Sequence, residues 1–223
     1  MATINPVSTK RARFSIPIFS LVLLLLFTSN SLAGFKMPFP NGQTWDVSQG
    51  WANNSGCSHA SGQMSYAIDF NLPGSDDEGK PVLSTESGKV LMVENNCVVG
   101  DTECNGKWGN TIIVDHGGNP NRYSKYAHLQ QQSVRVVKDQ WIPQGYIIGR
   151  LGNTGNSTGP HLHFQIQDSG DLYGQSVQFA FDEYSFTSTG PSCSVSPPLY
   201  TSQNIDIPII GHWIKNNPDT YGD

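Results

Sequence analysis

Apolar residues in this chain fall in short runs that Gly, Pro, Asn and Asp interrupt. Short runs with alternating or continuous apolar character predict β-strands, and the interrupting residues predict turns. The strand signals lie at 82–85, 89–93, 111–114, 123–129, 146–149 and 161–167, with further candidates at 176–181 and 205–210. No window after residue 33 has an apolar stripe of helical period. We therefore expect an all-β fold, an antiparallel sandwich or partly open barrel with few or no helices.

The N-terminus has the pattern of an export signal. Lys10, Arg11 and Arg13 precede an apolar stretch over residues 14–27, and Ser31-Leu32-Ala33 fits a small-x-small cleavage site. The alternative is a membrane anchor, but the uninterrupted apolar core is shorter than the ~20 residues that a span needs. We expect a signal peptide at 1–33 and one domain at 34–223. The polar, Pro-containing segment 34–49 should run extended along that domain.

Charge narrows the possible partners. The chain has 223 residues, with 13 Lys and Arg against 18 Asp and Glu, and its net charge of -5 argues against nucleic-acid binding. Only 14% of the residues are charged, which also argues against a charged disordered chain or a coiled coil. We expect an exported protein, periplasmic or secreted, that is monomeric and has no membrane contact once the signal is removed.

Four cysteines in an exported chain suggest two disulfides. Cys97 and Cys104 bracket a short polar loop, so we expect them to pair and to leave Cys57 with Cys193. Four cysteines allow three pairings, and this one is the preferred interpretation. Metal binding by cysteine is the rival interpretation, but the sequence contains no C-x2-C pair.

The strongest chemical signal is His161-Leu162-His163. On a strand, residues two apart share a face, and ~3.3 Å per residue would place these two about 6.6 Å apart. One histidine can then bind a metal while the other faces a metal-bound water. Alone, the motif could equally be two surface histidines. However, a Gly- and Asn-rich loop at 152–160 feeds directly into this strand, and such loops let backbone approach a ligand closely.

Three more residues upstream have suitable chemistry. His128 lies on a strand signal, and His59 precedes Asp69, which stands between Ile68 and Phe70. A carboxylate buried between apolar residues needs a cation or a metal to be tolerated. The alternative for Asp69 is a strand-end residue that caps a turn.

Together these residues predict a catalytic zinc site. His59, Asp69 and His163 would supply three ligands and leave the fourth position for water, whose pKa zinc lowers to about 7. His128 and His161 would remain near the metal without binding it. They could hold the attacking water, stabilise the oxyanion and pass a proton to the leaving amine.

The sequence resembles family M23 of zinc metallopeptidases, the lysostaphin-type enzymes that cut peptides in bacterial peptidoglycan. The matching features appear in family order over roughly residues 50–167. They are His59 with Asp69-Phe70, Gly79-Lys80-Pro81-Val82, Gly88-Lys89-Val90, residues 109–117 from Gly109-Asn110 to His116-Gly117, Tyr126-Ala127-His128-Leu129, and Gly152-Asn153-Thr154-Gly155 with His161-Leu162-His163-Phe164. Several motifs in order are far more specific than any one of them.

The resemblance implies a mostly antiparallel β fold with a metal at the floor of a groove. It implies Zn²⁺ as the cofactor, His59, Asp69 and His163 as its ligands, and His128 and His161 as catalytic histidines that do not bind the metal. The gap of ten residues between His59 and Asp69 is longer than in many members of the family.

The remaining candidates have simpler interpretations. We expect His116 to be a strand-end turn residue and His212 to be a surface or tail residue. Asn110 could help to position substrate or close a turn, and we favour the turn. Tyr126 has the same strand parity as His128, so it could face the groove or only pack.

We therefore expect an exported zinc endopeptidase that hydrolyses peptide cross-links or bridges of peptidoglycan by attack of zinc-activated water. The alternative is a non-catalytic M23-like domain that binds cell wall or activates another hydrolase. A second alternative is the same chemistry on another target, such as a Gly-rich secreted protein. The scissile bond stays open between oligoglycine bridges and D-Ala cross-links.

Overall fold

The computed structural model describes residues 34–51, 59, 62–72, 77–182, 184–187 and 213–216. Its strands, in chain order, are β1 Thr44–Gln49, β2 Ile68–Asn71, β3 Pro81–Leu83, β4 Gly88–Glu94, β5 Asn110–Asp115, β6 Tyr123–Leu129, β7 Trp141–Ile142, β8 Ile147–Arg150, β9 Leu162–Gln167, β10 Tyr184–Thr187 and β11 Trp213–Asn216. Among the described residues, the one helical element is a short 3-10 turn at Cys104–Lys107.

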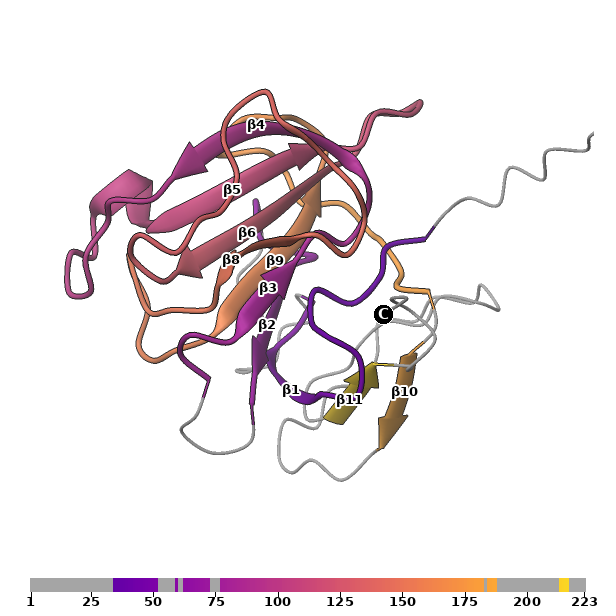
Figure 1. Ribbon diagram of the computed structural model, residues 1–223, viewed down its shortest axis with the longest axis horizontal. Helices are drawn as coiled ribbons and strands as arrows, with labels where there is room; N and C mark the ends of the chain where they lie inside the picture. Colours follow the sequence, from indigo (N-terminus) through magenta and orange to yellow (C-terminus); the bar gives the residue numbers. More distant parts are fainter. Residues whose placement is uncertain are drawn as a thin grey trace, which may run out of the picture. The chain divides into compact units, whose positions relative to one another are not determined.

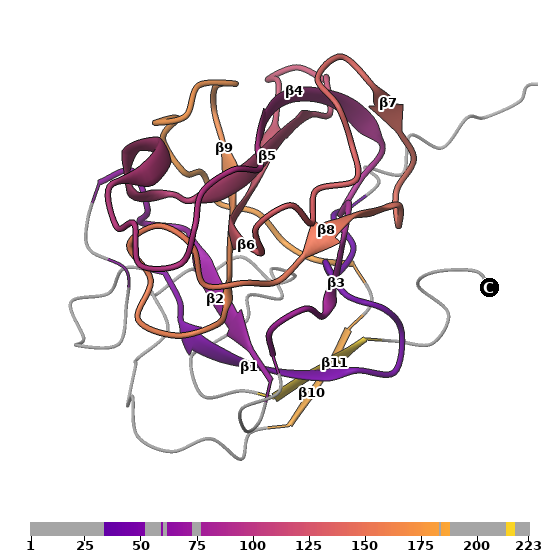
Figure 2. The same ribbon diagram turned by 60° about the vertical axis from the view of Figure 1, so that its left-hand side comes forward.

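Nine strands form one antiparallel sheet in the order β10-β11-β1-β2-β9-β6-β5-β4-β7, and β3 pairs with β8 in a second, two-stranded sheet. Figure 1 shows β4, β5, β6 and β9 as neighbours in the large sheet, and Figure 2 shows the β3–β8 pair apart from them. The prediction of an all-β, antiparallel fold is confirmed. No helix in the described ranges has the length and apolar character needed to cross a membrane.

Alternation of side chains along the strands builds the core. In β9, Leu162, Phe164 and Ile166 are buried in the main hydrophobic cluster. Val82 of β3 and Ile148 of β8 belong to the same cluster, so the small sheet packs on the apolar face of the large one. The alternate positions of β9 point to the other face, and they are buried polar residues. The site described below is on that polar face.

The segment before β1 contributes to the core as well as running along it. Phe35, Met37 and Phe39 are almost fully buried, and Phe39 stacks on Trp45 of β1 with 3.7 Å between ring centroids. β1 pairs with β2 through a register shift between Val47 and Gln49. The sequence pattern did not predict β1, because only Trp45 and Val47 are apolar among its six residues.

Residues 176–181 form no strand, only isolated bridges at Ser176 and Phe181, so that strand prediction is wrong. The sequence there is apolar because Phe179 and Phe181 fill the core, and not because they join a ladder. Cys97 and Cys104 form the expected disulfide. Cys57, Cys193, His212 and the 205–210 strand candidate lie outside the described residues.

Candidate functional site

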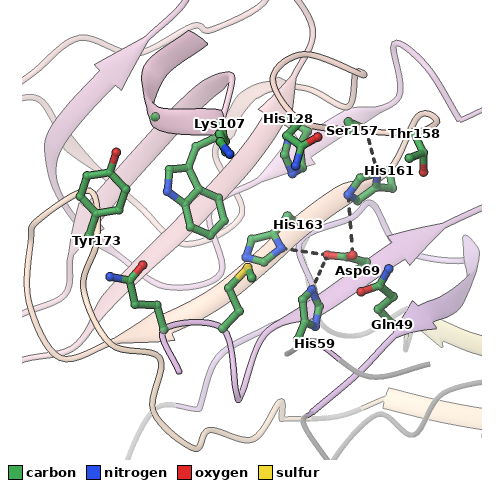
Figure 3. A pocket seen from close by; sticks show the side chains of 15 residues that line it. Gln49, His59, Asp69, Lys107, His128, Ser157, Thr158, His161, His163 and Tyr173 are labelled. Atoms are coloured by element: carbon green, nitrogen blue, oxygen red, sulfur yellow. Dashed lines mark hydrogen bonds and ion pairs between the residues drawn. The ribbon is translucent and has the colours of Figure 1, made fainter. Parts of the chain in front are cut away.

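A pocket of about 460 Å³ opens on the polar face of the large sheet, over β2, β6 and β9. All five residues singled out from the sequence line it: His59, Asp69, His128, His161 and His163. Figure 3 shows their side chains directed toward one another from separate segments of the chain. The structure thus brings together residues that span more than a hundred positions of sequence.

Strand register places Asp69 beside His163. The two residues are direct partners across the β2–β9 pair. Their sequence neighbours Ile68, Phe70 and Leu162 are buried in the core, so alternation turns Asp69 and His163 to the opposite face. The core packing therefore determines where these two polar side chains point.

His59 completes a compact set of three. His163 Nδ1 lies 2.9 Å and His59 Nε2 lies 3.2 Å from the same Asp69 oxygen, Oδ1. One potential ligand atom from each residue lies within 4.8 Å of the other two. All three residues are buried, with at most 5% of each exposed.

Hydrogen bonds on the far side of each ring decide which nitrogen carries the hydrogen and which faces Asp69 with a lone pair. His59 Nδ1 donates to the carbonyl oxygen of Gly50 at 3.1 Å, because a carbonyl can only accept. His163 Nε2 lies 3.2 Å from Gln165 Oε1. A neutral imidazole that donates on one side has its lone pair on the other, so His59 Nε2 and His163 Nδ1 both direct lone pairs at the Asp69 carboxylate.

A ladder of glutamines on β9 holds the His163 tautomer. Gln165 Nε2 donates to Gln167 Oε1 at 2.9 Å and to the carbonyl oxygen of Gly174 at 3.3 Å, which leaves Gln165 Oε1 as an acceptor. Gln167 Nε2 in turn donates to the carbonyl oxygens of Ser169 and Asp171. Both glutamines are fully buried. The alternation of polar residues at 163, 165 and 167 is the sequence signal that could have revealed this ladder.

This arrangement fits a divalent metal. Two imidazole nitrogens and one carboxylate oxygen form a donor set that suits Zn²⁺, and without a cation three electron pairs face one another. Burial opposes ionisation of Asp69, yet His163 and His59, when they are protonated and donate to the carboxylate, hold its pKa well below the usual range through their hydrogen bonds and charges. Burial lowers the pKa of His59, but the hydrogen bond and charge of Asp69, together with the backbone bonds to Gly50 and Ala67, raise that pKa overall. Positive charge is therefore favoured between the three side chains.

His128 reaches the pocket through an irregularity in β6. The β5–β6 register shifts between Asn110 and Ile112, and His128 has a φ of 60°, a left-handed conformation uncommon outside glycine. The shift breaks the alternation, so Tyr126 does not share a face with His128. Tyr126 is instead buried in the core, where its hydroxyl group accepts a hydrogen bond from the backbone N–H of Thr85 at 2.8 Å.

His128 and His161 face the pocket as a pair, with ring centroids 4.8 Å apart. His128 Nδ1 donates to the carbonyl oxygen of Thr154 and His161 Nδ1 to that of Gly159, both at 2.8 Å. Each neutral ring therefore carries its lone pair on Nε2. His161 Nε2 lies 3.7 Å from Asp69 Oδ2. Burial lowers the pKa of His128 to about 3, with the neighbouring His161 and His163 adding to the effect, so His128 is a neutral acceptor near pH 7.

Glycines allow the loop at 152–160, which carries the carbonyl groups of Thr154 and Gly159, to lie close to the backbone at Gly109. Gly109 and Gly155 have φ values of 61° and 75°, and a Cβ on Gly109 would collide with the backbone of Thr154. Asn110 ties the disulfide loop to β6, because its side chain bonds both the N–H and the C=O of Cys97 and the C=O of Leu129. Asn110 therefore links two segments from the start of β5 and does not close a turn.

One wall of the pocket was not anticipated from sequence. Trp108 lines it with its ring 4.9 Å from that of His163, and the buried Lys125 places Nζ 3.3 Å from the Trp108 ring centroid. Lys125 Nζ donates to the carbonyl oxygen of Leu172 at 2.6 Å, and burial lowers its pKa to about 7. His116 lies away from the pocket, where it bonds Ser87 and Ser124.

The fold and the pocket define a β-sheet protein with a two-histidine, one-carboxylate candidate metal site and two adjacent histidines. A model of Peptidase family M23 matches residues 63–177, more than half of the chain. The chain belongs to this family. His59 lies just before the matched segment.

Individual relatives match over part of the chain. The peptidoglycan DD-endopeptidase ShyA of Vibrio cholerae is 35% identical over 99 residues, 44% of this chain and 19% of ShyA. Lysostaphin of Staphylococcus simulans is 35% identical over 105 residues, 47% of this chain and 18% of lysostaphin. The solved catalytic domain of lysostaphin from Staphylococcus simulans is 25% identical with a TM-score of 0.41, over 60% of this chain and 88% of that domain. The matches therefore span about a fifth of the length of these two full-length relatives.

Proposed function

We propose that this protein is an exported, zinc-dependent endopeptidase that hydrolyses peptide cross-links or bridges of bacterial peptidoglycan. The observation that carries the proposal is the convergence of lone pairs from His59, His163 and Asp69 beside two further histidines that present Nε2 to the pocket. Family membership and the peptidoglycan DD-endopeptidase activity named for ShyA support the substrate class. In this proposal residues 1–33 are the signal, and residues 34–223 are the monomeric enzyme in the periplasm or outside the cell.

His59, Asp69 and His163 would hold the zinc ion. When bound there, Zn²⁺ supplies Lewis-acid polarisation of a carbonyl and lowers the pKa of a water in the pocket. The protein's own contribution is orientation, because each ring is held by a hydrogen bond to Gly50 or Gln165 on its far side.

His128 and His161 would act on the attacking water. Each is held by a backbone carbonyl through Nδ1 and presents Nε2 to the pocket, so either can accept a proton from the attacking water. A protonated ring can then donate to the oxyanion and return the proton to the leaving nitrogen. The low pKa of His128 makes it a weak base and, once protonated, a strong acid. We therefore assign to His161 both the uptake of the proton from the water and its return to the leaving nitrogen. His128 stays neutral and accepts a hydrogen bond from the attacking water through Nε2, which orients that water.

The test combines metal content with clearing of purified peptidoglycan, with and without a chelator. One zinc per chain and chelator-sensitive clearing are expected, and His163→Ala should lose both. His116→Gln is the matched control, since that histidine lies outside the pocket, and it should keep both. Zinc and clearing retained in His163→Ala would refute the assignment. A wild-type chain with neither property would favour the non-catalytic wall-binding or activating domain.

The wild-type digestion products also identify the scissile bond. A new amino-terminal glycine would indicate cleavage within oligoglycine bridges. A new carboxyl-terminal D-Ala would indicate cleavage of D-Ala cross-links. Cleavage of Gly-rich proteins with no action on peptidoglycan would contradict the proposed substrate class while preserving the reaction type.

A further inference from the structure

Gly34 makes a close contact with an acidic side chain far along the sequence. Its backbone nitrogen donates to Asp182 Oδ2 at 2.6 Å. The Asp182 N–H donates back to the carbonyl oxygen of Phe35 at 2.8 Å, and Phe35 and Phe181 form a parallel bridge. The start of the domain is thus bonded to residues 181–182 by both backbone and side chain.

Glycine leaves room for this contact. A Cβ on Gly34 would collide with the carboxyl group of Asp182. The absence of a side chain is what lets the carboxylate reach the nitrogen. The neighbouring Phe35 and Phe181 are 1% and 3% exposed, which anchors the contact to the core.

The charges around the contact favour a cation at Gly34. Arg122 Nη2 lies 3.7 Å from Glu86 Oε2, and its guanidinium also lies 4.7 Å from the centre of the Phe35 ring. Burial raises the pKa of Glu86, Arg122 lowers it, and Asp182 raises it further, so the two carboxyl groups repel each other. Arg122 balances the Glu86 carboxylate. A positive charge on the Gly34 nitrogen would balance Asp182 in the same way.

Gly34 is also the residue that would follow the Ser31-Leu32-Ala33 cleavage site. In the uncut chain its nitrogen is a neutral amide. After the cut it is an α-ammonium group at the same place, and a charged donor makes a stronger bond to a carboxylate. We infer that cleavage between Ala33 and Gly34 produces an α-ammonium group on Gly34, and that the Asp182 carboxylate binds this group in the mature protein.

The consequence is a domain that becomes more stable when it is processed. The ion pair fastens the segment that carries Phe35, Met37 and Phe39 into the core, and the precursor lacks it. The inference rests on the proposed signal peptide and is independent of the proposed peptidase activity, because none of its residues lines the pocket.

The test exports the full chain in a bacterial host in two forms, unchanged and with one serine inserted between Ala33 and Gly34. Intact mass determines the N-terminus of each product. The inserted residue moves the free amine about 3.8 Å along the chain but keeps the Gly34 amide, and hence the neutral bond to Asp182. Melting is followed in the presence of a chelator, so that metal content does not contribute.

The chain that begins at Gly34 should melt about 2–4 °C higher than the serine-extended chain. In an Asp182→Asn background this difference should vanish. In an Asp171→Asn background, which neutralises an exposed acid elsewhere, it should persist. Equal melting of the two forms, or a mass that places the natural cut elsewhere, would overturn the inference.

A second measurement does not depend on the folding of the Asp182 variant. The α-amine of the natural product should react with an amine-acylating reagent at least about tenfold more slowly than the α-amine of the serine-extended product, because a bonded and charged amine is a poor nucleophile. Equal rates in the two folded products would also overturn the inference. Activity on peptidoglycan plays no part in either readout, so failure here leaves the proposed function untouched.

Discussion

Gln165 offers the sharpest test of how the site is oriented. It is fully buried on β9, and its Oε1 accepts the hydrogen of His163 Nε2 at 3.2 Å. Replacing it with leucine leaves that N–H without a partner and removes the reason for the hydrogen to stay on Nε2. The alternative tautomer, with hydrogen on Nδ1, would donate to Asp69 Oδ1, which lies 2.9 Å away. Metal binding would then have to displace a hydrogen bond within the ligand set.

The magnitude follows from those contacts. An unsatisfied buried donor costs about 1–3 kcal/mol, and loss of such supporting bonds lowers metal affinity about 10–100-fold. We therefore expect Gln165→Leu to weaken zinc binding by about that factor, which corresponds to roughly 1.4–2.7 kcal/mol. Gln165→Glu keeps an acceptor for His163, so its zinc affinity should stay within a few-fold of the wild type, although loss of the bonds to Gln167 and Gly174 should lower its free energy of unfolding.

The assay is competition for zinc against a chelating dye at fixed pH, with circular dichroism to check the fold. Gln131→Leu is the matched control, because that glutamine is exposed in the turn after β6. Unchanged zinc affinity in folded Gln165→Leu would refute the tautomer explanation. Equal losses in Gln165→Leu and Gln165→Glu would also contradict it, since only the former removes the acceptor.

Three further outcomes are expected. His128→Ala should keep its zinc in a metal assay but lose about 10²–10⁴-fold in turnover, since the histidine orients the attacking water and does not bind metal; loss of zinc would contradict its assigned role. Burial lowers the pKa of His116 to about 4, below the ordinary 6.5. As the pH falls from 6.5 to 4, the unfolded chain therefore binds a proton at this histidine and the folded chain does not, so the free energy of unfolding declines. In His116→Gln, this decline of up to about 3 kcal/mol in the free energy of unfolding should be missing. Denaturant unfolding measures it, and identical pH profiles for the variant and the wild type would refute the explanation. Gly109→Ala, which puts a Cβ against Thr154 at a φ of 61°, should lower the unfolding free energy by about 1–3 kcal/mol, and unchanged denaturant stability would show that the loop can move aside.

The sequence by itself determined the all-β class of this protein and six of its strands, β3, β4, β5, β6, β8 and β9. Most of the predicted strands appear, because alternation of apolar and polar residues is a local property that burial on one face of a sheet enforces. The same local reasoning predicted the Cys97–Cys104 disulfide, where short separation keeps the two thiols close. The motif spacing singled out five pocket residues, and their catalytic and metal-binding roles remain predictions.

Tertiary structure decided what local periodicity could not encode. The β2–β9 register places Asp69 opposite His163 across 94 residues of sequence. The irregularity at His128 separates it from Tyr126, although the two share strand parity. The orientation of the His163 ring depends on Gln165, whose amide is in turn fixed by Gln167. Each feature results from packing and hydrogen bonds between distant segments, and a pattern read one strand at a time has no access to these contacts.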